Sequence, residues 1–112
     1  MESIRQQKIN RLLSKELSNI FRADSHSSYD GAMITVTVVK ITKDMSIAKV
    51  YLSLFLVKNK EEMISRIKEN TREIRYKLGT KVKDQLRITP ELEFFLDDSL
   101  DYIENIDNLL KQ

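Results

Sequence analysis

The spacing of apolar residues changes along this chain, and the changes restrict the folds that it can adopt. In residues 2–22 apolar side chains such as Ile9 and Leu13 recur every three or four positions, which predicts an amphipathic helix. In residues 33–41 they alternate with a period of two, which predicts a strand. The helical spacing returns over residues 59–86. A chain with both periods must pack helices against a sheet, so we predict an α+β fold.

Two strands are predicted close together in the first half of the chain. Residues 23–31 are small and polar and end in glycine, so we expect a loop there. In the strand that follows, Ile34, Val36 and Val38 fall on one side. A short polar turn separates this strand from residues 47–55, where side chains alternate again. Two alternating runs this close predict an antiparallel hairpin.

The second helical region is longer than a domain of this size normally needs, so we expect a break in it. Asn59 is a suitable N-cap for its first turn. The apolar stripe lapses between Asn70 and Arg72, and Gly79 offers a flexible backbone position further on. The sequence does not decide between these two positions for the break.

A third strand and a short terminal helix complete the expected elements. Pro90 marks the start of the strand, in which Leu92 and Phe94 alternate with acidic side chains. A last, short helix is expected within residues 98–110. We therefore predict one domain over residues 1–112, with a three-stranded sheet covered on one face by helices.

Charge and composition narrow the environment of the protein. The 112 residues carry 19 basic and 17 acidic side chains, so the formal net charge is only +2. The charges are unevenly placed, because residues 1–90 hold 18 of the basic side chains and residues 91–112 hold seven of the acidic ones. The chain has no cysteine and no apolar run of membrane-spanning length. We expect a cytoplasmic protein, most simply a monomer, without a membrane partner.

Basic side chains concentrate where they can meet a polyanion. From Arg66 to Arg87 the basic residues clearly outnumber the acidic ones. Ammonium and guanidinium groups bind phosphates, and the counterions released add affinity without recognition of bases. A weaker group lies on the outer face of the first helix, where charge often serves solubility alone. The candidate RNA-binding residues are Lys8, Arg11, Lys15, Arg72, Arg75, Lys77, Lys81, Lys83 and Arg87.

Features typical of enzymes are weak in this chain. His26 lies beside serines and near Asp24, but neighbours in one loop cannot hold the geometry of a catalytic triad. Gly79 belongs to no glycine-rich phosphate loop. We expect no catalytic residue, no metal site, no cofactor and no small-molecule substrate. Tyr51 and Phe95 face away from the main apolar stripes, either to stack on bases or to lie under another element.

Two motifs resemble the ribosome-binding factor A family (RbfA). The first is MITVTVVKITKDMSIAKVYLSLF at residues 33–55, with a Lys-Asp turn and an A-K-V-Y-like second strand. The second is RITPELEFFLDDSL at residues 87–100, which is similar to the family's R-I-x-P-E-L-x-F-x-x-D-x-S pattern. The two motifs occur in the family's order, and the resemblance extends over nearly the whole chain.

The resemblance implies a type II KH-like domain that binds ribosomal RNA of the free small subunit and assists its late maturation and processing, without catalysis. RNA-binding KH modules usually clamp a strand with a G-x-x-G loop. Here Gly79 is followed by Val82 where a second glycine would stand, so the clamp is absent. The family's Ala-x-Gly kink aligns with residues 70–72, which are Asn-Thr-Arg.

The residues alone also allow a function of another class. The chain would then be a protein-interaction adaptor that uses its long helix and its acidic C-terminal helix without contacting RNA. Reversal of basic charges separates the two hypotheses, because only an RNA-binding protein should lose RNA affinity while it remains folded.

Overall fold

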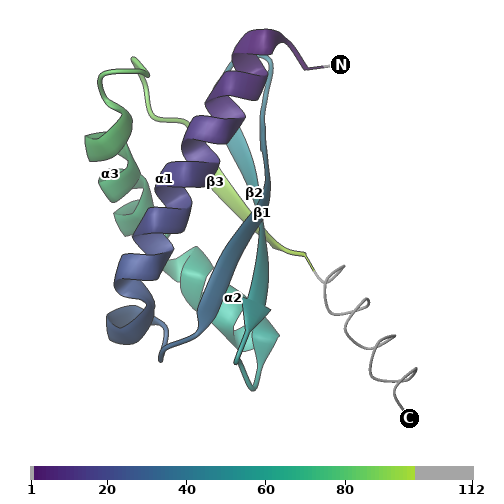
Figure 1. Ribbon diagram of the computed structural model, residues 1–112, viewed down its shortest axis with the longest axis vertical. Helices are drawn as coiled ribbons and strands as arrows, with labels where there is room; N and C mark the ends of the chain where they lie inside the picture. The colour runs from purple at the N-terminus through teal and green to yellow at the C-terminus, as the bar shows by residue number, and fades with distance from the viewer. Residues whose placement is uncertain (1, 98–112) are drawn as a thin grey trace.

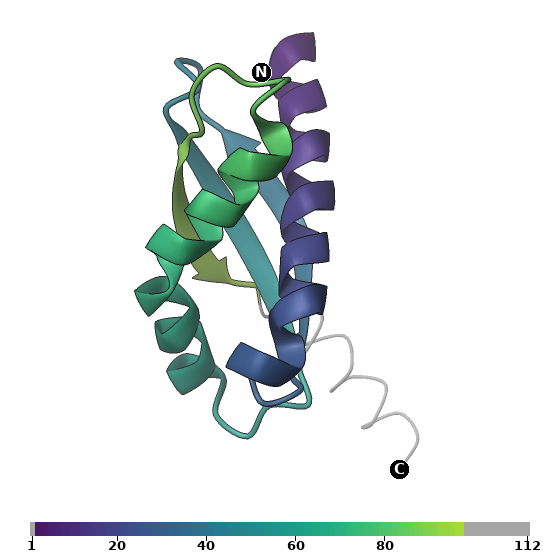
Figure 2. The same ribbon diagram turned by 90° about the vertical axis from the view of Figure 1, so that its left-hand side faces the viewer.

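The fold has two layers, with helices on one face of a mixed sheet (Figure 1, Figure 2). The computed structural model describes residues 2–97. The predicted C-terminal helix falls in residues 98–112 and so lies outside the described residues. The remaining order confirms the predicted α+β class. The elements are α1 (Ile4–Ser28), β1 (Met33–Ile41), β2 (Ile47–Phe55), α2 (Lys60–Glu69), α3 (Thr71–Val82) and β3 (Glu91–Leu96).

The sheet has the order β1-β2-β3. β1 and β2 pair in antiparallel fashion, which confirms the predicted hairpin. β3 pairs with β2 in parallel, with Leu92 beside Ala48 and Phe94 beside Val50. Parallel neighbours need a long crossover connection, and α2 and α3 supply it on the same face that α1 covers (Figure 2). The two basic regions of the sequence are thereby carried by the same layer.

A β-bulge in β1 changes which of its valines is buried. The sequence pattern groups Val38 with Val36. In the structure Val36 pairs with Leu52, but the register shifts before Val38, which pairs with Tyr51. The extra residue reverses the alternation, so Val39 is only 6% exposed whereas Val38 is 40% exposed. The predicted placement of Val38 on the same side as Val36 was wrong.

The first helix is longer than its sequence predicts. We expected a loop over residues 23–31, but α1 continues to Ser28. Later elements hold its last turns. Lys77 of α3 donates to the carboxylate of Asp24 at 2.8 Å. Arg66 of α2 donates to the carbonyl of Ser28 at 3.5 Å. These partners lie far away in the sequence, so the small polar residues alone indicated a loop.

Side chains near the start of α1 attach it to the end of β1. Ser3 and Gln6 form a capping box, in which each side chain accepts a hydrogen bond from the other's backbone N–H. Gln6 also donates to the carbonyl of Ile41 at 3.2 Å, and the N–H of Ile41 donates to Asn10 at 2.8 Å. These bonds set the rotation of α1 about its own axis and so decide which face it turns to solvent.

The break in the second helical region lies at Asn70, one of the two positions left open by the sequence. α2 begins after the predicted cap Asn59, whose side chain accepts from the N–H of Glu62. α2 ends at Glu69 with Asn70 as its C-cap, and Thr71 donates its hydroxyl to the carbonyl of Lys68 at 2.6 Å. Asparagine and threonine are weak helix formers whose side chains bond to nearby backbone. α3 runs through Gly79 without interruption.

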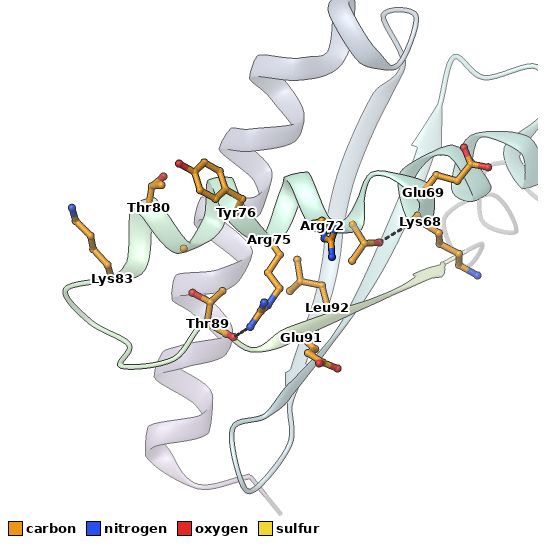
Figure 3. Close-up of a pocket in the computed structure, with 12 residues that line it drawn as sticks. Lys68, Glu69, Arg72, Arg75, Tyr76, Thr80, Lys83, Thr89, Glu91 and Leu92 are labelled. Atoms are coloured by element: carbon orange, nitrogen blue, oxygen red, sulfur yellow. Dashed lines mark hydrogen bonds between the residues drawn. The ribbon is translucent and has the colours of Figure 1, made fainter.

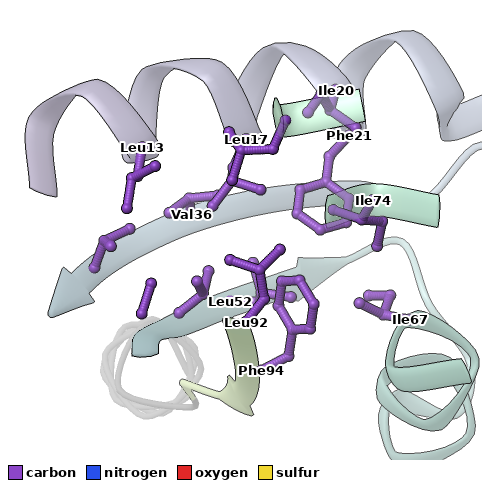
Figure 4. Close-up of a cluster of buried hydrophobic side chains, with 14 of the residues drawn as sticks. Leu13, Leu17, Ile20, Phe21, Val36, Leu52, Ile67, Ile74, Leu92 and Phe94 are labelled. Carbon is purple, nitrogen blue, oxygen red and sulfur yellow. The ribbon is translucent and has the colours of Figure 1, made fainter. Parts of the chain in front are cut away.

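The core lies between the helical layer and the sheet (Figure 4). Leu13 and Leu17 of α1, Leu52 of β2 and Leu78 of α3 are completely buried. Each such side chain contributes about 1.5–3 kcal/mol through removal of apolar surface from water. The predicted apolar stripes of all three helices therefore meet in one core.

The other face of the sheet has no helix over it within residues 2–97. Lys40 and Lys49 are exposed there, beside Glu93 in the register. Tyr51 and Phe95 stack on each other, with ring centroids 5.2 Å apart. Within the described residues no helix combines the length and apolar character that crossing a membrane requires.

Candidate nucleic-acid interface

The outer face of α1 carries the first group of predicted RNA-binding side chains. Lys8, Arg11 and Lys15 are exposed, whereas Ile9 and Leu13 on the other side of the helix are buried. The bonds from Gln6 and Asn10 to β1 turn this basic face away from the sheet. No hydrogen bond or ion pair to any of residues 2–97 engages these three cations. Their charges are free to meet phosphates.

The second group extends from the first turn of α3 to the segment that follows the helix. Arg72, Lys81, Lys83 and Arg87 are exposed. In the described part of the chain none of the four is engaged in a hydrogen bond or an ion pair. Because α1 and α3 cover the same face of the sheet, both groups lie on the helical side of the molecule (Figure 2). The structure thus packs two helices that carry these cations, and that are distant in sequence, against each other.

Arg75 differs from the other candidates, because its guanidinium binds the protein's own backbone. Its Nη2 donates to the carbonyl of Thr89 at 2.6 Å and its Nε donates to the carbonyl of Pro90 at 3.1 Å. The side chain is half-buried. These bonds fasten the segment before β3 to α3, so we assign Arg75 a positioning role.

Lys77 is also engaged within the protein. Its ammonium lies 2.8 Å from a carboxylate oxygen of Asp24 on α1 and 3.4 Å from one of Glu73. The hydrogen bond to Asp24 raises the pKa of Lys77 above its ordinary value, and the charge of Glu73 adds to this. Two carboxylates offset its charge, so Lys77 joins α3 to α1 and contributes less to the positive face.

A groove of about 920 Å³ lies between α3 and the segment that enters β3 (Figure 3). Arg72, Tyr76 and Lys83 line its α3 side, and Thr89 and Leu92 line its other side. The hydrogen bonds from Arg75 to the carbonyls of Thr89 and Pro90 hold the two walls together. The groove is therefore a preformed depression, lined by basic side chains and also by the acidic Glu69 and Glu91.

Gly79 permits the close packing at the bottom of this groove. A Cβ atom at this position would lie 3.0 Å from Oγ1 of Thr89. The absence of a side chain therefore lets Thr89 approach the α3 backbone. Gly79 was a candidate for the helix break, but its structural contribution is this contact.

Tyr76 is a candidate that the sequence analysis missed. Its side chain is 74% exposed, and it lies on α3 one turn after Arg72 and one turn before Thr80. In Figure 3 its ring lies along the α3 rim of the groove. The helical spacing to the neighbouring cation was the available signal, since residues four apart share a face.

Other residues considered from the sequence have ordinary surroundings. Tyr51 and Phe95 pack on each other on the open side of the sheet, away from the helical cations. His26 is exposed in the last turn of α1. Residues 2–97 contain no group of three or more acidic or histidine side chains placed to hold a metal ion.

Comparisons with known proteins agree with the architecture. The family model described as Ribosome-binding factor A matches residues 5–110. The protein of that name from Cytophaga hutchinsonii is 42% identical over 112 residues, which cover 100% of this chain and 84% of the relative. The crystal structure of ribosome-binding factor A from Thermus thermophilus is 23% identical, with a TM-score of 0.69 over 81% of this chain and 94% of that one.

A second set of coordinates has the same fold. It is a homology model of the Thermus thermophilus factor fitted into a cryo-EM map of a 30S–RbfA complex, with 21% identity and a TM-score of 0.59. The alignment covers 88% of this chain and 97% of that one. These likenesses confirm the predicted KH-like fold.

Proposed function

The chain belongs to the ribosome-binding factor A family, and from this premise we propose that it binds ribosomal RNA of the free small subunit and assists its late maturation. It does so by binding alone, without catalysis. Curated relatives carry the name of ribosome-binding factor, and a structure of the same fold is fitted in a 30S complex. Both observations support the small subunit as the partner.

The positive face of the helical layer is the observation that carries the RNA contact. On α1 it contains Lys8, Arg11 and Lys15, and we call these the α1 cations. Around α3 it contains Arg72, Lys81, Lys83 and Arg87, and we call these the α3 cations. Exposed cations without intramolecular partners are suited to phosphates, which they contact without reading base sequence.

Salt dependence tests this proposal. We expect the protein to co-sediment with free small subunits more strongly than with complete ribosomes. If about five phosphates are neutralised, the logarithm of affinity for small-subunit RNA should fall against the logarithm of salt with a slope of roughly −3 to −5. The measurement is a binding titration repeated over a series of salt concentrations.

Charge reversal on α3 identifies the surface. In the variant Lys81→Glu/Lys83→Glu two phosphate contacts are lost, so RNA affinity should fall at least tenfold and the slope should become shallower by about 2. The matched control is Lys40→Glu/Lys58→Glu, which makes the same charge change at exposed positions outside the α1 cations and the α3 cations. Circular dichroism confirms that both variants are folded.

The outcome also decides between the two functions that the residues allow. A flat salt response, or equal losses in the two variants, contradicts the proposed RNA contact. Association with small subunits that survives without any RNA affinity would instead favour the protein-interaction adaptor. Its acidic C-terminal helix was predicted in residues 98–112, outside the described residues.

A further inference from the structure

We propose that residues 98–112 of this chain form a helix that packs on the open side of the sheet, which no helix of residues 2–97 covers (Figure 1). The residues of this surface belong neither to the α1 cations nor to the α3 cations, so the proposal goes beyond the RNA contact. Three features of the molecule support it: the way in which the described chain ends, an apolar row beside that end, and a surplus of positive charge beyond the row.

The last described residue is fastened on the open side of the sheet. Asp97 follows β3, and its backbone N–H donates to the carbonyl of Leu52 in β2 at 2.7 Å. Its carboxylate accepts a hydrogen bond from the hydroxyl of Thr37 in β1 at 2.6 Å. Because β2 lies between β1 and β3, this carboxylate reaches across the middle strand. Asp97 points to the same side of the strand as Phe95, so the crossing occurs on the side that we propose the following residues cover.

An apolar row crosses the open side next to this residue. Val38 pairs with Tyr51, and Tyr51 pairs with Phe95, so the row extends over all three strands. The two rings stack on each other, but Phe95 is still 38% exposed and Val38 is 40% exposed. An apolar helix face placed over this row would remove these side chains from water, which stabilises the covered state.

A charged row lies beside the apolar row, on its side remote from Asp97. Lys40 pairs with Lys49, and Lys49 pairs with Glu93. Two ammonium groups in directly opposite positions of neighbouring strands repel each other, and a single carboxylate accompanies them in this row. The row therefore has a surplus of positive charge, which an acidic segment would offset.

The sequence of residues 98–112 complements both rows. The segment carries four acidic side chains and one basic side chain. A helix would place four apolar side chains on one side, which are Leu100, Ile103, Ile106 and Leu110. From the first to the last of these the helix would be about 15 Å long, and about 13 Å of β3 separates Asp97 from Glu93. A helix that turns back from Asp97 can therefore cover the apolar row and reach the lysines.

A spin label on the full chain tests this packing. The chain has no cysteine, so Asn105→Cys provides a single site for a nitroxide. Asn105 would lie on the side of the helix opposite the apolar stripe, where the label does not disturb the contact. The nitroxide should broaden the amide NMR signals of Val38 and Lys49 on the open side, and it should affect the signal of Lys81 on α3 far less.

Two pairs of variants of the labelled chain separate the apolar contribution from the charged one. Ile103→Asp interrupts the apolar stripe and should lower the equilibrium constant for packing at least about tenfold, so most of the broadening at Val38 should disappear. Its matched control Leu109→Asp makes the same kind of change off the stripe and should retain the broadening. Lys49→Glu should also reduce the broadening, whereas Lys58→Glu, outside the two rows, should not.

The result can also identify another occupant. Spin-labelled chain without isotope is mixed with isotope-labelled chain that carries no spin label, and broadening at Val38 in this mixture would show that a second copy covers the sheet. That result, the absence of broadening in the labelled chain, or equal broadening in Ile103→Asp and Leu109→Asp would overturn the proposal. The amide signal of the buried Leu78 should keep its position in every variant, which shows that the fold is unchanged.

Discussion

The basic residues of α3 look alike in the sequence, but their position around the helix gives them different roles. Arg72 and Lys83 are exposed and unpaired within the described residues, so their charges face solvent. Arg75 lies toward β3 and binds two backbone carbonyls. Lys77 lies toward α1 and binds Asp24. A shift of a few residues turns a cation by a large angle around the helix, and that angle decides its partner.

Removal of Arg75 should therefore affect folding. In Arg75→Ala the carbonyls of Thr89 and Pro90 lose their charged donor, which should lower the free energy of unfolding by about 1.5–3 kcal/mol. Urea denaturation measures this change. The control Arg72→Ala removes an exposed arginine from the same helix and should stay within about 0.5 kcal/mol of wild type. Equal stability of the two variants would refute the positioning role of Arg75.

At the scale of elements, polar groups join the end of α1 to the α2–α3 junction. Tyr29 is buried, and its hydroxyl accepts a hydrogen bond from Asn70 at 3.4 Å. Burial raises the pKa of Tyr29 above 10.0. The hydrogen bond to Asp24 raises the pKa of Lys77 above 10.5. Both groups therefore hold their protons more tightly in the folded protein than in the unfolded chain.

This junction should make the fold sensitive to alkali. A raised folded-state pKa stabilises the protein below the unfolded pKa, and the contribution is lost as the pH rises through the folded value. Thermal unfolding from about pH 8 to about pH 11 should therefore show a falling melting temperature. In Tyr29→Phe/Lys77→Met neither group titrates, so the fall should be smaller than in wild type.

Lys81→Met provides the comparison for this experiment. It also removes one lysine from α3, but this lysine is exposed and makes no ion pair with any residue from 2 to 97. The melting temperature of this variant should fall between about pH 8 and about pH 11 by as much as that of wild type. A double variant that loses as much stability as wild type would show that the junction does not cause the effect.

At the scale of the whole molecule, the two faces of the sheet have different character. One face is covered by α1 and α3, the helices that carry the α1 cations and Arg72 and Lys81 of the α3 cations (Figure 2). On the open side Lys49 lies beside Glu93, and Tyr51 stacks on Phe95. A polyanion should therefore approach the helical side, where positive charges from two elements add.

The α1 and α3 cations should act on the same polyanion. Lys8→Glu/Lys15→Glu should weaken RNA binding and make the salt slope shallower by about 2, and combination with Lys81→Glu/Lys83→Glu should add the two losses in free energy. Titrations of the single sets and the combined variant at several salt concentrations measure this. An unchanged slope in the α1 variant would limit the interface to α3.

Much of the fold was predictable because its cause is local. The change in the spacing of apolar residues predicted the helices and strands. Asn59 and Pro90 correctly predicted where α2 and β3 begin. The break was narrowed to two positions, and only the structure shows that it lies at Asn70 and that α3 continues through Gly79. The candidate site was predictable only as a set of charges. The sequence did not reveal Tyr76 as part of a groove, because a groove needs two walls.

The sequence by itself determined the α+β class, the hairpin and the positive charge of the first helix and of the region around α3, since periodicity and composition are properties of neighbouring residues. Tertiary structure decided the length of α1, the burial of Val39 in place of Val38, and which cations stay free. Each of these depends on a partner that is distant along the chain. Hydrogen bonds and ion pairs act over a few ångströms, so only the folded arrangement could show which partners meet.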